Sequence, residues 1–341
     1  MARERVFIVA DDLTGALDSA AGFAERGARV RVACRPRDLP AALGSAAEVI
    51  AVATGTRDGT EAEAARVAAA VARDLAGHSG ILFKKIDSRL KGHVAAELAP
   101  LAASGARLVV NPAIPALGRL CLQGAVCGAG VEVPIPVAPR IGRALQIPDT
   151  RTQADLAAQL PEDLSEAVYV GAAGLAEALA DRLWPGGAAR PLPRLELPAL
   201  LAIGSRDPVT LAQVDALRDV PVLEAPNGAC PELPDAPLLL IRMTPGAEEI
   251  PGDAAAAAFA GTLAEAQRHV RPATLFACGG ESAAALLARL GIGQLDVLGQ
   301  ILPGVPVART AEGAPLVIIT KSGGFGPPDS LVKLVKFLPT V

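Results

Sequence analysis

The sequence predicts an α/β protein of two domains, each a mainly parallel sheet flanked by helices, with the active site in the cleft between them. Short apolar or β-branched runs alternate with Ala-rich helical segments along most of the chain. A Pro/Gly-rich segment without periodicity, 186–198, separates two such parts. The 341 residues are enough for two cores. We therefore expect domains at 1–185 and 199–341, joined by a linker at 186–198.

The first domain is expected to begin with a buried strand at Val6–Ala10, which ends at two aspartates. A helix over Thr14–Arg26 should follow, with Gly27 as its C-terminal stop. The other elements predicted for this domain are strands at Val30–Ala33, Val49–Ala53, Ile81–Ile86, Leu108–Asn111 and Ala167–Gly171, and helices at Glu61–Ala76, His93–Ala103, Ala154–Leu160 and Leu175–Leu183. Residues 111–148 are rich in proline and glycine, and the order of helices and strands in them cannot be predicted from the pattern.

Composition excludes several classes of protein. The net charge of −4 and the 3% aromatic content disfavour a nucleic-acid partner, which needs a basic face or stacking rings. The five cysteines are odd in number and form no C-x-x-C pair, so a disulfide framework or zinc site is not expected. No apolar stretch reaches the roughly 18 residues of a membrane span. We expect a soluble, cytoplasmic protein with no nucleic-acid or membrane partner.

Three predicted strands of the second domain run directly into glycine-rich turns. They are Leu200–Ile203 before Gly204-Ser205, Thr274–Cys278 before Gly279-Gly280-Glu281, and Leu316–Thr320 before Lys321-Ser322-Gly323-Gly324-Phe325-Gly326. Glycines let the backbone approach a ligand closely, and amides at such turns bind phosphate. Parallel sheets bind ligands outside the carboxyl ends of their strands. This half of the chain is therefore predicted to bind a nucleotide.

Each polar residue at these turns has a second interpretation. Glu281 could hold the Mg²⁺ ion of a nucleotide, or it could only cap its helix. Lys321 could reach the phosphates, or be a solvated lysine at a strand end. Ser205 could bind a phosphate or ribose, or be a helix N-cap or turn serine. The sequence has no Gly-Lys dipeptide and no G-x-G-x-x-G after a strand, so a Walker A loop and a standard dinucleotide fingerprint are both missing.

Charged residues follow the predicted strands of the first domain. Asp11 and Asp12 could accept hydrogen bonds from substrate hydroxyls; alternatively, Asp12 caps the following helix and Asp11 is solvated. Residues 84–93, KKIDSRLKGH, place four cations around Asp87 and suit an anionic molecule such as a carboxylate, unless they form a basic surface loop. Arg57 adds a guanidinium. Asp12 and Asp87 are the candidates for a general base, which would take the proton of a substrate hydroxyl.

Eight motifs occur in the order seen in the four-carbon acid sugar kinases, and the chain resembles that family. They are ADDLTGALD at 10–18, KKIDSRLKG at 84–92, NPAIPALGR at 111–119, VGAAGLA at 170–176, GSRDPVT at 204–210, GGESA at 279–283, LPGVP at 302–306 and KSGGFG at 321–326. The family includes 3-oxo-tetronate kinases and threonate kinases. The resemblance implies an N-terminal acid-sugar domain, a C-terminal nucleotide domain, ATP with Mg²⁺, and a homodimer.

The resemblance also implies a reaction and two sets of site residues. ATP would phosphorylate a terminal hydroxyl of a sugar acid of about four carbons, such as a 3-oxo-tetronate or threonate. The residues that would face the sugar acid are Asp11, Asp12, Arg57, Lys85, Asp87, Ser88 and Arg89. Those that would face ATP are Ser205, Gly279, Gly280, Ser322, Gly323 and Gly326, and the residue patterns at the turns add Glu281, Lys321 and Gly324 to them.

The chain departs from the family pattern at several points. It is shorter than its relatives, and the missing length is expected between Gly124 and Asp149, in the substrate half. Leu17 and Gly324 stand where asparagine is usual. These departures leave the acceptor open and keep a non-catalytic nucleotide- or metabolite-binding paralogue as an alternative. An NAD(P)-dependent oxidoreductase is a weaker alternative because the dinucleotide fingerprint is missing.

Overall fold

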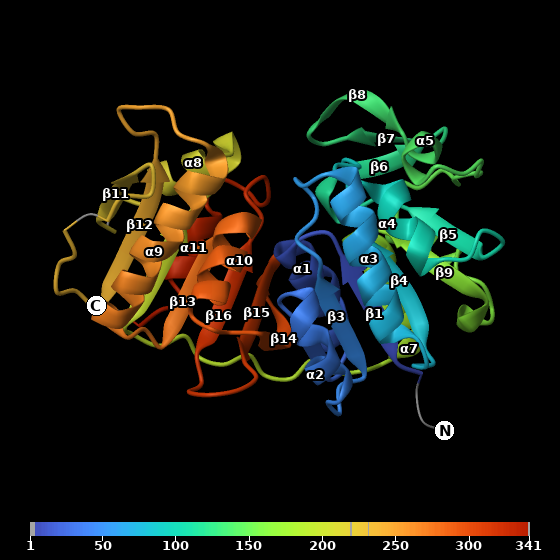
Figure 1. The fold of residues 1–341 in the computed structure, drawn as a ribbon, viewed down its shortest axis with the longest axis horizontal. Helices are drawn as coiled ribbons and strands as arrows, with labels where there is room; N and C mark the ends of the chain where they lie inside the picture. Colours follow the sequence, from blue (N-terminus) through green and yellow to red (C-terminus); the bar gives the residue numbers. More distant parts are fainter. Residues whose placement is uncertain (1–3, 219, 231, 340–341) are drawn as a thin grey trace. The chain divides into compact units, whose positions relative to one another are not determined.

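The computed structural model describes residues 4–218, 220–230 and 232–339. The chain divides into two compact units, Met1–Arg190 and Pro191–Val341, and the division falls inside the segment 186–198. In each unit helices flank a sheet of mainly parallel strands (Figure 1), which confirms the predicted α/β fold class. No helix among the described residues is both long and apolar enough to cross a membrane.

Unit 1 is built on a parallel sheet with the strand order β2-β3-β1-β4-β9-β5. The strands are β1 (Val6–Ala10), β2 (Val30–Ala33), β3 (Val49–Ala53), β4 (Ile81–Lys85), β5 (Arg107–Asn111) and β9 (Ala167–Gly171). Every residue of β1 and β3 is buried. Continuous apolar runs of this kind are typical of parallel strands covered on both faces.

Helices cover both faces of this sheet. They are α1 (Leu13–Ala24), α2 (Leu39–Leu43), α3 (Glu61–Leu75), α4 (Val94–Leu101), α6 (Gln153–Ala157) and α7 (Ala173–Leu183), with short 3₁₀ turns at Pro36–Asp38, Pro115–Leu117 and Leu164–Glu166. Phe7 and Val9 of β1 pack with Leu39 of α2 and Val71 of α3. Alternate side chains of a strand face opposite sides, and α1 packs on α7 and against β1 to β3 on the other face.

The Pro/Gly-rich region that the pattern could not order forms a small antiparallel sheet, β6-β7-β8. Its elements are β6 (Arg119–Leu122), β7 (Ala125–Gly128), β8 (Val131–Pro136) and the helix α5 (Val137–Ile141). Gln123 and Gly124 turn the first hairpin with φ of 51° and 73°. Val126 is buried with Val110 and Leu98, which joins this sheet to the core of unit 1. The turn is Gln-Gly and lacks the Asn-Gly or Asp-Gly pair that signals a tight hairpin in a sequence.

Unit 2 has the strand order β11-β12-β10-β13-β16-β15-β14, parallel up to β16 and antiparallel thereafter. Its strands are β10 (Ala199–Ile203), β11 (Val222–Pro226), β12 (Leu238–Thr244), β13 (Thr274–Cys278), β14 (Gln294–Leu302), β15 (Val305–Thr310) and β16 (Val317–Lys321). Its helices are α8 (Pro208–Asp215), α9 (Gly252–Val270), α10 (Gly280–Arg289) and α11 (Ser330–Val335). α8 and α11 bury Val214 and Leu334 against the sheet, while α9 and α10 pack together and against β10, β13 and β16.

Candidate functional site

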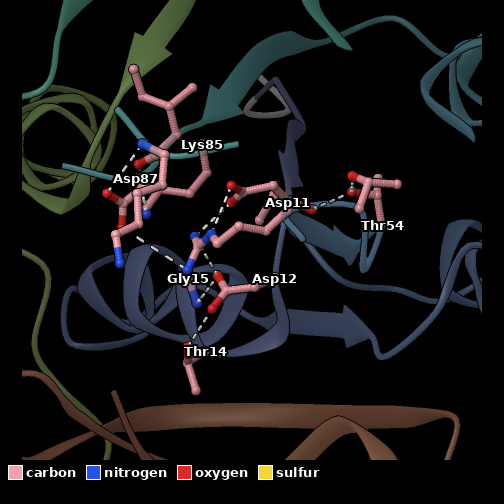
Figure 2. Close-up of polar contacts among 12 residues, drawn as sticks. Asp11, Asp12, Thr14, Gly15, Thr54, Lys85 and Asp87 are labelled. Atoms are coloured by element: carbon pink, nitrogen blue, oxygen red, sulfur yellow. Dashed lines mark hydrogen bonds and ion pairs between the residues drawn. The ribbon is translucent and has the colours of Figure 1, made fainter. Parts of the chain in front are cut away.

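In unit 1 the charged motifs meet at one edge of the sheet. Ala10 at the end of β1 lies level with Ala53 of β3 on one side and with Lys85 of β4 on the other. The residues that follow these strands therefore emerge side by side, as parallel strands require. Figure 2 shows the resulting group of polar side chains around Asp11 and Asp12.

Arg57 is the centre of this group. Its Nε donates to Asp11 Oδ2 at 2.8 Å, and its Nη2 donates to Asp11 Oδ1 at 2.7 Å and to Asp12 Oδ1 at 2.9 Å. Asp87 Oδ2 lies 4.0 Å from Arg57 Nη1. Three carboxylates thus surround one guanidinium, whose planar fork suits two parallel hydrogen bonds to one carboxylate.

Asp11 is buried, so the alternative of a solvated aspartate is wrong. Burial by itself raises the pKa of Asp11, but the hydrogen bonds and charge of Arg57, with the charges of Lys84 and Lys85, outweigh burial and lower the pKa below its usual value. Asp12 does cap α1, because its Oδ1 accepts from the Gly15 N–H at 2.8 Å. Besides capping the helix, Asp12 also accepts a hydrogen bond from Arg57.

Of the four cations in residues 84–91, only Lys91 is exposed, so the alternative of a basic surface loop is wrong for the rest. Lys84 and Lys85 are buried. The Lys85 ammonium donates to the Ile86 carbonyl at 2.8 Å. Asp87 Oδ1 accepts from the Arg89 N–H at 2.8 Å, which folds the loop around the carboxylate. Ser88 is buried as well, and its hydroxyl accepts from Arg119 Nη1 at 2.6 Å. Arg89 is only half-buried, so its guanidinium keeps access to solvent.

Glu97 joins this site from α4 and was not predicted. Its Oε2 lies 3.0 Å from the Lys84 ammonium, and its Oε1 accepts from the hydroxyls of Thr54, at 3.3 Å, and Thr56. Lys84 and Glu97 are both fully buried. The network anchors the loop that carries Arg57. A signal was present in the sequence, because Glu97 shares a helix face with Val94, three residues earlier, and stands next to buried Leu98.

In unit 2 the three glycine turns lie together at one edge of the sheet. Cys278 at the end of β13 lies level with Ile203 of β10 and with Lys321 of β16. The turns touch so closely that side chains would not fit. A Cβ on Gly323 would lie 2.1 Å from Ser205 Oγ, and a Cβ on Gly279 would lie 3.2 Å from Ser205 N. The three segments therefore form one surface built of backbone.

Ser205 and Lys321 occupy the inside of this surface. The Ser205 hydroxyl accepts from the Asp207 N–H at 3.2 Å, and Asp207, not Ser205, is the N-cap of α8. Ser205 is therefore the turn serine of the two local alternatives. Lys321 is buried, so the alternative of a solvated lysine is wrong. Burial lowers the pKa of Lys321, and its ammonium donates to carbonyls of its own turn instead of reaching outward.

Glu281 is exposed in the first turn of α10, whose N-cap residue is Gly279. Gly279 has a φ of 107°, a conformation that glycine adopts without strain. Within the described residues no group of three or more His, Cys, Asp or Glu side chains is placed to hold a metal ion. A Mg²⁺ ion bound here would take most of its ligands from phosphates and water, with one or two carboxylates, and Glu281 fits that pattern.

The structure is that of a two-domain α/β protein, and comparison with known proteins matches a family model to each unit. Residues 6–138 match the model of a sugar-binding N-terminal domain, and residues 239–331 match that of a nucleotide-binding C-terminal domain. The chain belongs to the four-carbon acid sugar kinase family. It is a kinase that acts on a sugar acid.

Two relatives illustrate the similarity. A D-threonate kinase of Cupriavidus necator is 31% identical over 405 aligned positions, which include 95% of each chain. A 3-oxo-tetronate kinase of the same organism is 29% identical over 70% of this chain and 54% of its own. A solved structure from Salmonella typhimurium LT2 shares the fold, with a TM-score of 0.72 at 19% identity, over 97% of this chain and 98% of its own. The alignment with the D-threonate kinase exceeds the 341 residues of this chain, so that relative carries segments that this chain lacks.

Proposed function

We propose that this kinase transfers the γ-phosphoryl group of ATP to a terminal hydroxyl of a four-carbon sugar acid, with D-threonate as the first candidate acceptor. The observation that carries the proposal is that one chain combines a guanidinium-and-carboxylate edge in unit 1 with a backbone-lined glycine edge in unit 2. The D-threonate kinase is 31% identical over nearly its whole length, which supports the same acceptor class.

The acceptor is proposed to bind at the edge of unit 1. The residues assigned to it are Asp11, Asp12, Arg57, Lys85, Asp87, Ser88 and Arg89. Arg89 would hold the carboxylate of the acid, because it is the half-buried arginine of this loop and its guanidinium can grip a carboxylate through two bonds. The carboxylates would orient the hydroxyls.

Asp87 is the better of the two general-base candidates. A base needs a lone pair within reach of the substrate hydroxyl. Both oxygens of Asp12 already accept, Oδ1 from Gly15 and Arg57 and Oδ2 from Thr14 at 2.6 Å. Asp87 Oδ1 accepts from the backbone N–H groups of Arg89 and, at 3.4 Å, of Lys91. Among the described residues, its Oδ2 has only the more distant Arg57 guanidinium at 4.0 Å. Asp87 Oδ2 would therefore take the hydroxyl proton, and Asp12 would keep Arg57 and the end of α1 in place.

ATP is proposed to bind at the edge of unit 2. The residues assigned to it are Ser205, Gly279, Gly280, Glu281, Ser322, Gly323, Gly324 and Gly326, with Lys321 acting from behind the turn. Their backbone N–H groups and the amino end of α10 suit an anion. A Mg²⁺ ion, when bound, neutralises phosphate charge, and Glu281 is the carboxylate that would hold it. Phosphoryl transfer then depends on position and charge, without a covalent protein intermediate.

A direct assay tests the proposal. Purified protein is mixed with ATP, Mg²⁺ and, in separate reactions, D-threonate, D-erythronate and a 3-oxo-tetronate, and ADP formation is followed with mass spectrometry of the product. We expect turnover with one of these acids and loss of at least about a hundredfold in kcat for Asp87→Asn, the usual size of a general-base contribution. Asp58→Asn, one residue after Arg57, is the control for the substitution itself.

Failure to form ADP with every acid would count against the proposed reaction, and ADP binding without turnover would favour a non-catalytic paralogue. The homodimer implied by the family stays a prediction, which light scattering of the purified protein would check.

A further inference from the structure

We propose that three buried side chains, Thr210, Gln213 and Lys321, turn the backbone amides of Gly323, Gly324 and Gly326 outward so that they can bind the nucleotide phosphates. We call these three side chains the inner donors. The inference rests on the proposed function, because it assigns to the nucleotide site residues that set its geometry without touching the ligand. Two of them, Thr210 and Gln213, lie on α8, outside the glycine-rich turn itself.

The ammonium of Lys321 sits inside its own turn. Its Nζ donates to the carbonyl oxygens of Ser322 at 2.9 Å, Gly323 at 3.3 Å and Phe325 at 2.9 Å. The residue is only 1% exposed. An ammonium has three N–H donors, so these three carbonyls match its capacity.

The two donors on α8 complete the set from the neighbouring helix. Thr210 Oγ1 donates to the Gly323 carbonyl at 2.7 Å. Gln213 Nε2 lies within hydrogen-bond distance of three successive carbonyls, those of Phe325 at 3.0 Å, Gly326 at 3.1 Å and Pro327 at 2.9 Å. Thr210 and Gln213 are both fully buried. Together these bonds reach every carbonyl of residues 322–327 except that of Gly324.

The direction of the carbonyls determines the direction of the amides. A peptide unit is planar and trans, so its N–H points opposite to its C=O. When the carbonyls of Ser322, Gly323 and Phe325 point inward, the N–H groups of Gly323, Gly324 and Gly326 point outward. Among the described residues, none of these three N–H groups donates a backbone hydrogen bond or one to a side chain. Outward amides of successive residues form the concave arrangement that binds anions.

The charge of Lys321 adds to this geometry. Besides the neighbouring Cys278 thiol, its ammonium contacts the carbonyl oxygens of the turn. The charge of Asp207 also acts on it, but among the described residues no carboxylate forms an ion pair with it. A positive charge that is buried without an ion pair raises the electrostatic potential at the amides in front of it, and a low local dielectric strengthens the effect. The ammonium would therefore favour phosphate while remaining behind the backbone.

The experiment measures ADP binding by calorimetry and steady-state kinetics in the full-length protein. Thr210→Val removes the hydroxyl without changing the shape of the side chain, and Thr210→Ser keeps it. Gln213→Met removes the amide donor at similar volume. We expect Thr210→Val to weaken ADP binding about 3- to 10-fold, the worth of one hydrogen bond, and Gln213→Met to weaken it more. Thr210→Ser should stay within about twofold of wild type.

Thr274→Val is the matched control. The Thr274 hydroxyl is also buried in unit 2 and also donates to a carbonyl, that of Glu196 at 2.8 Å, but it lies at the amino end of β13, the opposite edge of the sheet. This variant should lose stability and keep the ADP affinity of wild type. The KM for the sugar acid should not change in any of the four variants, which separates an effect on the turn from general loosening.

Three outcomes would overturn the inference, and they are distinguishable. If wild type binds ADP and Thr210→Val and Gln213→Met bind it equally well, the inner donors do not set the phosphate site, while the proposed function stands. If Thr274→Val weakens ADP binding as much as Thr210→Val, the effect is one of stability alone. If wild type binds no nucleotide, the proposed function fails and this inference fails with it.

Discussion

Arg57 and Asp11 form a two-pronged ion pair, with Nε to Oδ2 at 2.8 Å and Nη2 to Oδ1 at 2.7 Å, across 46 residues of sequence. The Asp11 side chain is 3% exposed and that of Arg57 is 18% exposed. The pair joins the end of β1 to the loop after β3. Arg57 also binds Asp12, so it fixes both aspartates that follow β1 relative to that loop. Because the pair is buried, its loss affects folding as well as binding.

The first prediction concerns Asp11→Asn. The change leaves the Arg57 guanidinium in a poorly solvated place with one of its carboxylates gone, so the free energy of unfolding should fall by about 3 kcal/mol. Urea denaturation measures this. The pKa of Asp11 is lowered from 3.8 in the folded protein. Its stabilising contribution is therefore complete above that value and is lost as pH falls through the folded-state pKa.

This pH dependence supplies a control for the first prediction. Wild type should lose stability more steeply than Asp11→Asn when the pH is lowered below about 4. Glu166→Gln is the comparison variant, because Glu166 pairs with Arg107 at 3.0 Å in the same unit and both side chains are more than half exposed. It should cost no more than about 1 kcal/mol. An equal cost for both variants would contradict the prediction.

The second prediction concerns the buried pair of Lys84 and Glu97. Glu97→Gln leaves the Lys84 ammonium without a carboxylate in the interior, which should cost about 3–5 kcal/mol of stability. Adding Lys84→Met removes the second charge and leaves the oxygen of the new amide to accept from Thr56. We therefore expect the double variant to be more stable than Glu97→Gln alone, as measured by chemical denaturation. A double variant that is less stable than the single one would show that the unpaired Lys84 charge is not the main cause of the stability lost in Glu97→Gln.

Much of unit 1 could be predicted because its parallel strands are short, apolar and bounded by helices. Strands β1, β2, β3 and β9 begin and end where the pattern predicts. The β6-β7-β8 sheet was not predicted, since hairpins with short turns bury few residues per strand and show no long alternation. The β14-β15 hairpin adds an antiparallel edge for which the parallel pattern gave no signal.

The candidate site shows the same limit. Residues that follow a strand, such as Asp11 and Gly279, could be found from the strand that positions them. Glu97, Thr210 and Gln213 act from inside helices and depend on which face is buried, which single-sequence patterns express weakly. Lys321 was predicted as a site residue, but its side chain points inward because three carbonyls of its own turn accept from the ammonium. Direction of a long side chain follows from tertiary contacts.

The third prediction concerns the close approach of Gly323 to Ser205. A Cβ at Gly323 would lie 2.1 Å from Ser205 Oγ and 3.0 Å from Ser205 Cβ. Gly323→Ala should therefore displace the turn and weaken ADP binding by about tenfold or more, since overpacking costs about 1–3 kcal/mol. Adding Ser205→Gly makes room and should recover part of the affinity, as calorimetry would measure.

The control for this third prediction is Gly261→Ala in α9, where an added Cβ would meet nothing within 4 Å. That variant should bind ADP like wild type and gain up to about 1 kcal/mol of stability from helix propensity. No recovery in the double variant would show that Gly323 is required for a reason other than its contact with Ser205.

The fourth prediction concerns the half-buried carboxyl groups of Glu177 on α7 and Asp18 on α1. Burial raises the pKa of Glu177 from 4.5 to about 7, and the charge of Asp18 contributes to the rise. Burial likewise raises the pKa of Asp18 from 3.8 to about 6. Between the unfolded and folded values the folded protein binds more protons than the unfolded chain, so stability should rise as pH falls from about 7 toward 4.5.

Glu177→Gln tests the direction of this pH dependence of stability, because glutamine keeps the shape of the side chain and carries no charge. At about pH 8 it should be more stable than wild type by on the order of 2 kcal/mol, and the difference should shrink at about pH 5 as Glu177 becomes protonated in the folded wild type. Glu162→Gln, at an exposed position of the same unit, should change stability at neither pH. Denaturation curves at the two pH values give the comparison. A Glu177→Gln variant that is less stable than wild type at the higher pH would mean that the Glu177 carboxylate is stabilised in the folded protein, and the assigned direction of its pKa shift would be wrong.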